Sequence, residues 1–162
     1  MKNIEALSIS EQVKTYQSIT ATTHFIFVYP EKASKNDVRV FFSVVPLAEI
    51  EPFFVAGKQS GATTYKPRFR ATTTDKHVLE AQYGKHYLCM TSELDTYLAA
   101  CREAANCKPS KLNRGHAAEY ALCERVFDCA WESIELDKPH TVAGDISANG
   151  NEYQVKYVGG WL

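Results

Sequence analysis

The sequence lacks any long hydrophobic run. None of its apolar stretches approaches the roughly 20 residues that a membrane-spanning helix needs. The first residues, from Met1 to Leu7, also lack the apolar segment of a secretory signal. We therefore expect a cytoplasmic protein that does not have a membrane among its partners.

The chain also lacks an excess of charge of either sign. Its 18 Lys and Arg residues against 19 Asp and Glu residues give a formal net charge of −1. This balance argues against a protein that coats nucleic acid by bulk charge, but it allows local basic patches around an acidic metal site. With 162 residues, of which 45% are hydrophobic and 23% charged, the composition is that of one globular domain with a substantial core.

Several sequence motifs are absent as well. No pair of the five cysteines has the Cys-x-x-Cys spacing of common zinc sites, so we expect free, mostly buried thiols. The chain has no Walker A loop, no Gly-x-Gly-x-x-Gly fingerprint and no Gly-x-Ser-x-Gly elbow. These absences give no support to nucleotide-binding classes or to the α/β-hydrolase class.

What is present is a mixture of helical and strand periodicity. We expect an α/β (α+β) fold, a single domain over residues 1–162 with a mixed central β-sheet flanked by helices. Residues 1–107 would supply N-terminal strands and helices, and residues 113–158 a helix followed by a hairpin. Helices are predicted over 8–19, over 92–105 and from 113 to before Asp137, and strands over 24–29, 38–45, 85–90, 141–146 and 152–158.

Residues 58–75 are expected to form a loop that contains Tyr65-Lys66-Pro67-Arg68-Phe69-Arg70. Basic side chains interleaved with aromatic ones can bind phosphates and stack on bases. A solvated loop with extended basic side chains is the simpler interpretation. The candidate nucleic-acid contacts in the whole chain are Lys66, Arg68, Arg70, Lys108, Lys111 and Arg114.

The last predicted strand alternates in character. Tyr153, Val155 and Tyr157 would face a core, and Gln154 and Lys156 the opposite side. Before the Asn149-Gly150 turn, which is a strong hairpin signal, Asp145 ends a mostly apolar strand. The hairpin would bring Asp145 onto or near the face that carries Gln154 and Lys156. A solvated face of an antiparallel hairpin is the simpler alternative.

These residue types are suited to holding Mg²⁺, which prefers hard oxygen ligands. The carboxylate of Asp145, the side-chain carbonyl of Gln154 and the backbone carbonyl of Val155 are candidate ligands. Lys156 would stabilise the negative charge that develops during phosphodiester hydrolysis. On the preceding helix, Glu119 would bind the metal through water or orient Lys156.

The order Gly115-x-x-x-Glu119, then Asp145, then Gln154-x-Lys156 resembles the PD-(D/E)XK nuclease superfamily, and most of all its Mrr-like restriction endonucleases. The resemblance implies a restriction-endonuclease-like fold and an endonuclease that uses Mg²⁺ or Mn²⁺ to hydrolyse phosphodiester bonds in DNA. It also implies that Asp145 and Gln154 are metal ligands, that Lys156 is the catalytic lysine and that Glu119 is the helical acid.

The chain departs from the superfamily pattern in three places. Gly144 stands where the pattern has Pro, Gln154 replaces the commoner acid, and the sequence ends six residues after Lys156. Three explanations are open: the first hundred residues supply the missing part of the core, a partner in a homodimer supplies it, or the core is incomplete. In the first case the strands at 24–29 and 38–45 extend the sheet. The alternative is a catalytically inactive nucleic-acid-binding or assembly module with the same fold. A third interpretation is an interaction protein with a chance motif.

Overall fold

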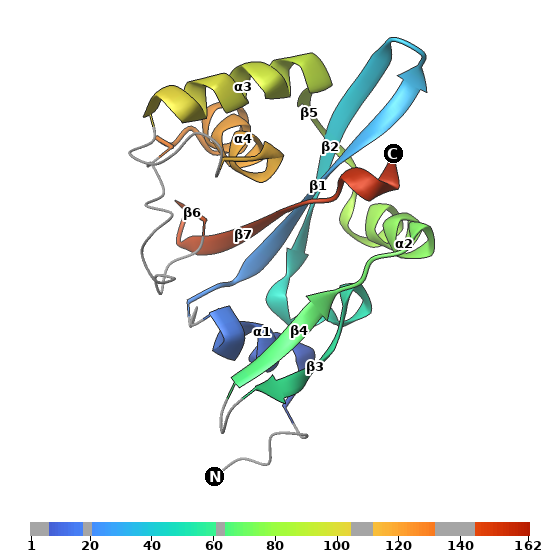
Figure 1. Cartoon of the computed structure of the whole chain (residues 1–162), viewed down its shortest axis with the longest axis vertical. Coiled ribbons are helices and arrows are strands. Elements are labelled where there is room, and N and C mark those ends of the chain that lie inside the picture. Colours follow the sequence, from blue (N-terminus) through green and yellow to red (C-terminus); the bar gives the residue numbers. More distant parts are fainter. Residues whose placement is uncertain (1–6, 18–20, 61–63, 105–111, 132–144) are drawn as a thin grey trace.

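The computed structural model describes residues 7–17, 21–60, 64–104, 112–131 and 145–162. Its centre is a curled sheet of five strands in the order β5-β2-β1-β7-β6 (Figure 1). The strands are β1 (His24–Ser34), β2 (Asp37–Pro46), β5 (His86–Met90), β6 (Ile146–Ala148) and β7 (Asn151–Tyr157).

The sheet is mixed. The strands β1 and β7 pair in parallel, whereas β1 with β2, β2 with β5 and β6 with β7 pair antiparallel. The pairing of β1 with β7 joins the N-terminal hairpin to the C-terminal hairpin in one sheet. The expectation that the N-terminal strands extend the sheet is therefore confirmed, and so is the expected class of an α+β domain with helices around a mixed sheet.

The hairpin of β1 and β2 is longer than its sequence predicts, because β1 continues through Pro30 to Ser34. The carbonyl of Val28 accepts the N–H of Val158, so the backbone of Val28 faces β7, and so does that of Pro30 two residues later. The pairing with β7 ends at Val28. The backbone nitrogen of Pro30, which has no hydrogen to donate, therefore faces an edge with which no described strand pairs. Proline is tolerated at such an edge.

Helices cover both faces of the sheet. On one face, α3 (Thr91–Ala104) and α4 (Arg114–Leu122) enclose a core with Ile26, Val28 and Tyr153. On the other face, the second core contains Val13 of α1 (Ile9–Gln17) and Leu79 of α2 (Thr73–Tyr83). Within the described parts of the chain, none of the helices is long and apolar enough to cross a lipid bilayer.

The region expected to be a loop contains the end of β3 (Phe54–Ser60), the strand β4 (Thr64–Phe69) and the start of α2, which corrects that prediction. The strand β4 pairs with β3 in a two-stranded ribbon, and α2 follows. Thr72 and Asp75 form a capping box at the start of α2, a local signal that was readable in the sequence. The strand β4 had no such signal. It depends on Phe69, whose ring lies against those of Phe54 and Phe27.

The C-terminal elements differ in extent from their predictions. The helix predicted from 113 to before Asp137 ends as α4 at Leu122. The strand β6 shares only Ile146 with the strand predicted over 141–146, so Asp145 precedes a strand instead of ending one, and residues 141–144 lie outside the described residues.

Asn113 caps α4, and its side chain accepts the N–H of Gly115 at 2.9 Å. A single π-helical turn (Cys123–Phe127) follows α4. Asn149 and Gly150 have φ angles of 51° and 78°, which fit the predicted type I′ turn between β6 and β7.

Candidate active site at the open edge of β7

One edge of β7 is paired with a described strand over only part of its length, and this part of the strand beyond the pairing is called the open edge. The strand β6 pairs with β7 only from Asn151 to Tyr153. Because Val158 donates its N–H to β1 and strand residues alternate in direction, the backbone N–H and C=O groups of Val155 and Tyr157 face away from β1. Within the described residues no strand pairs with this part of the edge. Polar backbone groups are therefore presented at the edge beyond Tyr153.

Asp145 occupies the first position on this edge. It lies just before β6, and its Oδ2 accepts the backbone N–H of Val155 at 2.9 Å. This side-chain oxygen takes the position that a backbone carbonyl of a longer β6 would have. The bond holds the carboxylate beside the strand, on the side to which the Val155 carbonyl also points.

Glu119 reaches the same region from α4. The side chain is 6% exposed, and its Oε2 has no hydrogen-bond partner among the described residues. The pKa of Glu119 lies well above its ordinary value of 4.5, first because burial disfavours the charged carboxylate and second because of the nearby negative charge of Asp145. The fold thus brings together two carboxyl groups that are far apart in the sequence.

Trp131 is the neighbour that the sequence patterns did not indicate. Its indole N–H lowers the pKa of Glu119, in opposition to burial and to Asp145. Trp131 Nε1 is itself buried without a hydrogen-bond partner in the part of the chain described. The Trp131 ring packs on that of Tyr120, with 5.5 Å between centroids. No motif in the sequence links Trp131 to the acid on α4, since only packing brings them together.

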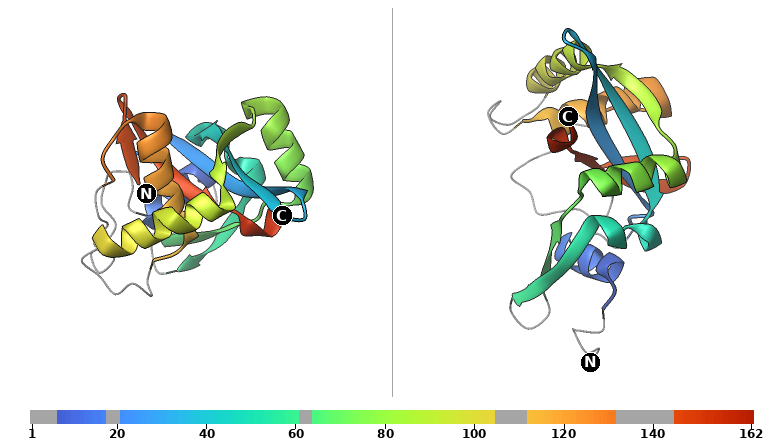
Figure 2. Two further views of the ribbon diagram at one scale, coloured as in Figure 1. Left: turned by 90° about the horizontal axis from the view of Figure 1, so that it is seen from above. Right: turned by 90° about the vertical axis from the view of Figure 1, so that its right-hand side faces the viewer.

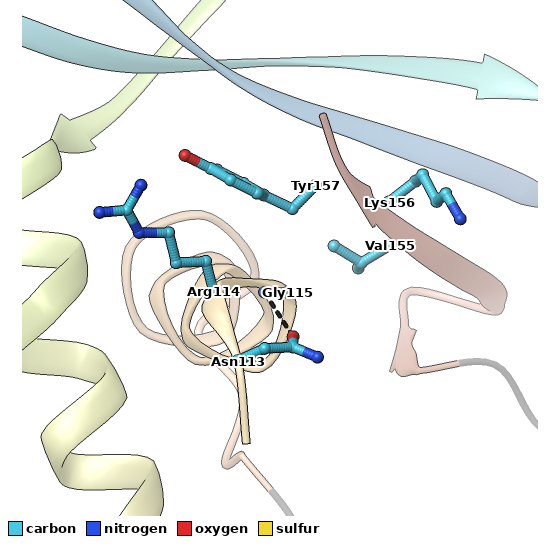
Figure 3. A pocket seen from close by; sticks show the side chains of 6 residues that line it. All are labelled: Asn113, Arg114, Gly115, Val155, Lys156 and Tyr157. Carbon is cyan, nitrogen blue, oxygen red and sulfur yellow. Dashed lines mark hydrogen bonds between the residues drawn. The ribbon is translucent and has the colours of Figure 1, made fainter. Parts of the chain in front are cut away.

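Gln154 and Lys156 do not join these carboxyl groups. Tyr153, Val155 and Tyr157 pack with the core on the α4 side, so Gln154 and Lys156 face the other side of the sheet. Lys156 Nζ lies 5.1 Å from the centroid of the Phe69 ring. Figure 3 shows Lys156 pointing away from Val155 and Tyr157. Asp145 is bonded to the Val155 backbone and lies close enough to Glu119 to raise its pKa, whereas the Gln154 and Lys156 side chains face the other side of the sheet.

A hollow of about 500 Å³ lies between the start of α4 and this part of β7. Its lining residues are Asn113, Arg114, Gly115, Val155, Lys156 and Tyr157 (Figure 3). Arg114 is half exposed and makes a long ion pair with Asp95, at 3.9 Å. Burial raises the pKa of Tyr157, and the guanidinium group of Arg114 opposes that rise. The buried hydroxyl of Tyr157 has no hydrogen-bond partner among the described residues. The hollow thus combines a guanidinium group with strand backbone.

The predicted nucleic-acid contacts are dispersed. Lys66, Arg68 and Arg70 lie exposed on or just after β4, on the opposite face of the sheet from α4. Lys108 and Lys111 lie outside the described residues. Of the four predicted contacts that the structure describes, Arg114 is the one beside the open edge of β7.

The described residues contain no group of three or more His, Cys, Asp or Glu side chains that is placed to hold a metal ion. Cys89, Cys101, Cys123 and Cys129 are free thiols, as expected. His116 is engaged at the helix start, where its Nδ1 accepts the N–H of Asn113 at 3.2 Å. Among the described residues, Asp145, Glu119 and the Val155 carbonyl offer oxygen atoms of the kind that a hard cation prefers.

Comparison of the chain with protein-family models, with curated proteins and with solved structures finds no match. The resemblance to the nuclease superfamily thus stays a prediction from the residues themselves.

Proposed function

We propose that this protein is a metal-dependent nuclease that hydrolyses phosphodiester bonds in DNA at the open edge of β7. One observation carries the proposal: the buried carboxyl group of Glu119 has an oxygen without a partner among the described residues, and Asp145 is near enough to raise its pKa. Two carboxylates in a poorly solvated place repel each other unless a proton or a cation lies between them. The cost of such a pair is understandable if it binds a cation.

The chemistry of this oxygen set fits Mg²⁺ or Mn²⁺. Asp145 and Glu119 offer carboxylate oxygens, and the Val155 carbonyl offers a neutral one, which matches the preference of Mg²⁺ for hard ligands with few carboxylates. When bound, the ion would polarise a phosphoryl oxygen and increase the acidity of a water molecule. Glu119 must lose its proton to take part, so the raised pKa makes binding of the ion depend on pH.

The neighbouring hollow suits a phosphate group of the substrate. Arg114 provides a guanidinium group, which can bind phosphate oxygens through two parallel N–H groups. Its ion pair with Asp95 is long and its side chain half exposed, so a phosphate can replace that partner at little cost. Arg114 would thereby position the backbone of DNA beside the two acids.

A second candidate is a nucleic-acid-binding or assembly module without catalysis. The observation that favours it is the position of Lys156, whose Nζ lies over Phe69 on the far face of the sheet. A catalytic lysine must approach the reacting phosphate, and this one extends away from both acids. The proposed nuclease therefore relies on Asp145 and Glu119, without a role for the Lys156 side chain.

The test is nicking of supercoiled plasmid with Mg²⁺ or Mn²⁺ and with EDTA. We expect metal-dependent nicking by the wild type and at least a 100-fold loss in Asp145→Asn and in Glu119→Gln, by analogy with the loss of an electrostatic group at an active site. Glu103→Gln, a change of an exposed acid on α3, is the matched control and should keep full activity.

Two results would decide against the nuclease. Nicking that survives both acid substitutions would place the activity elsewhere or in a contaminant. DNA binding without nicking by any version, in either metal, would support the non-catalytic module. Lys156→Ala belongs in the same series, since a loss of nicking comparable to that of Asp145→Asn would mean that Lys156 reaches the phosphate in the complex.

A further inference from the structure

The ribbon of β3 and β4 has one basic face. Residues alternate in direction along β4, so Tyr65 and Phe69 point toward the core and Lys66 and Arg68 point outward, followed by Arg70 in the same alternation. The three basic side chains are all exposed. Their spacing of two residues corresponds to about 6.7 Å along the strand. The outward positions Lys66 and Arg68 of β4, and Arg70 just after the strand, are thus all cationic.

These charges are not used within the described structure. None of the three side chains forms an ion pair or a hydrogen bond with another described residue. Because the whole chain has a net charge of −1, this face carries a local positive charge that the composition does not predict.

The ribbon is held firmly from its inner side. The helix α1 packs against β4, and the buried side chain of Gln12 accepts the N–H of Gly57 at 3.1 Å. The ladder shifts register between Val55 and Lys58, and such a bulge increases the twist of a ribbon. Figures 1 and 2 show the ribbon and α1 together at the end of the molecule farthest from α3.

At the bulge, the two strands approach so closely that only glycine fits. A Cβ atom on Gly57 would lie 2.2 Å from the backbone carbon of Lys66. The buried polar support from Gln12 and this close approach fix the conformation of the strand that presents the basic residues. A face that is only solvated requires neither the buried hydrogen bond from Gly57 to Gln12 nor the close approach of the two strands.

We propose that the outer face of the β3–β4 ribbon binds the phosphate backbone of duplex DNA through Lys66, Arg68 and Arg70. A two-stranded ribbon has the dimensions that the major groove of B-DNA admits, and rows of unpaired cations supply the salt-dependent part of DNA binding. This inference rests on the proposed function for its choice of DNA. The competing explanation is that these cations only protect an exposed edge from pairing with another chain.

The test is binding of a labelled 20-base-pair duplex in EDTA, measured by fluorescence anisotropy at several salt concentrations. The variant Lys66→Gln/Arg68→Gln/Arg70→Gln should bind more weakly, and its slope of log K against log salt should be shallower by about 2.7, which is 0.9 for each phosphate contact. The Kd of the wild type should then rise by a factor about 40 larger than that of the variant between 50 and 200 mM salt.

The matched control is Lys32→Gln/Lys35→Gln/Arg102→Gln. It removes the same charge from exposed positions in the β1–β2 hairpin and α3. It should keep the slope of the wild type. If both triple variants lost the same amount of duplex affinity and salt slope, net charge alone would explain the effect and the proposal would be overturned. The absence of DNA binding by the wild type would also overturn it. Tighter binding of the single strand than of the duplex would overturn the choice of ligand.

The plasmid assay separates this proposal from the nuclease. If the ribbon variant binds duplex like the wild type while Asp145→Asn alone abolishes nicking, the ribbon proposal fails and the nuclease stands. If the ribbon variant loses the salt-dependent binding while no version cuts DNA, the ribbon proposal stands and the nuclease fails.

Discussion

Asp145 accepts the backbone N–H of Val155 at 2.9 Å, so an aspartate side chain completes the ladder where the strand β6 has not yet begun. This contact fixes a carboxylate at the edge of β7 without covering the strand beyond it. A second acid, Glu119, is buried close enough for the charge of Asp145 to raise its pKa. The relationship between Asp145 and Val155 is therefore the origin of the candidate site.

The stability of the protein should depend on pH through Glu119. Because the pKa of Glu119 is raised by folding, its contribution is fully present below the unfolded pKa and is lost as pH rises toward the folded pKa. The wild type should lose up to about 1.4 kcal/mol per pH unit relative to Glu119→Gln in this window. Urea unfolding in EDTA from pH 4 upward measures the difference. A difference that stays constant with pH would show that Glu119 is not titrating as a buried acid.

Divalent metal should stabilise the folded protein through the same two acids. At 10 mM Mg²⁺ and a Kd of about 1 mM, linkage predicts a rise of roughly 4 °C in the Tm of the wild type. Asp145→Asn and Glu119→Gln should lose most of this rise, because each removes an anionic ligand. Thermal unfolding with Mg²⁺ or EDTA measures it, and the exposed Glu103→Gln serves as the control. An equal rise in all variants would place the metal elsewhere.

Gly57→Ala should destabilise the ribbon. The new methyl group would collide with the backbone at Lys66 and Pro67, with its nearest atom at 2.2 Å, and backbone cannot move away as a flexible side chain does. We expect a loss of roughly 1–3 kcal/mol in the free energy of unfolding. Gly160→Ala is the matched control, because no atom lies within 4 Å of its added Cβ, and it should be nearly neutral. Equal effects would contradict the close approach.

Lys156 and Phe69 should be energetically coupled. The ammonium group lies 5.1 Å from the ring centroid and links β7 to β4. A double-mutant cycle with Lys156→Ala and Phe69→Leu should give a coupling of roughly 0.5–1 kcal/mol, as for an exposed cation–π contact. Urea unfolding of the four proteins provides the cycle. If the two substitutions changed the free energy of unfolding additively, the Lys156 ammonium group would not interact with the Phe69 ring, and it could then lie nearer to Asp145 and Glu119.

The sequence correctly predicted the elements whose conformation depends on neighbouring residues in the chain. The Asn149-Gly150 turn has the positive φ angles that its residues favour, and Asn113 caps the helix that carries Glu119. The alternation in β7 was also readable, since Tyr153 and Val155 pack with one core. The same alternation correctly put Gln154 and Lys156 on the opposite side.

Elements whose conformation depends on contacts with distant segments were not predicted from the sequence. The strand β4 was expected to be a loop, because Lys66, Pro67 and Arg68 have no strand signal apart from their packing. The continuation of β1 through Pro30 depends on where β7 ends. The contact of Trp131 with Glu119 likewise arises from packing of residues that share no motif.

The sequence by itself determined the α+β class, the capped helix, the hairpin and the face to which each residue of β7 belongs, because these follow from local propensity and from a period of two. Only the tertiary structure decided which face meets α4, and hence that Glu119 lies with Asp145 while Lys156 lies over Phe69. The physical reason is that the choice of face is made by burial of apolar side chains from distant segments. A one-dimensional pattern does not contain that information.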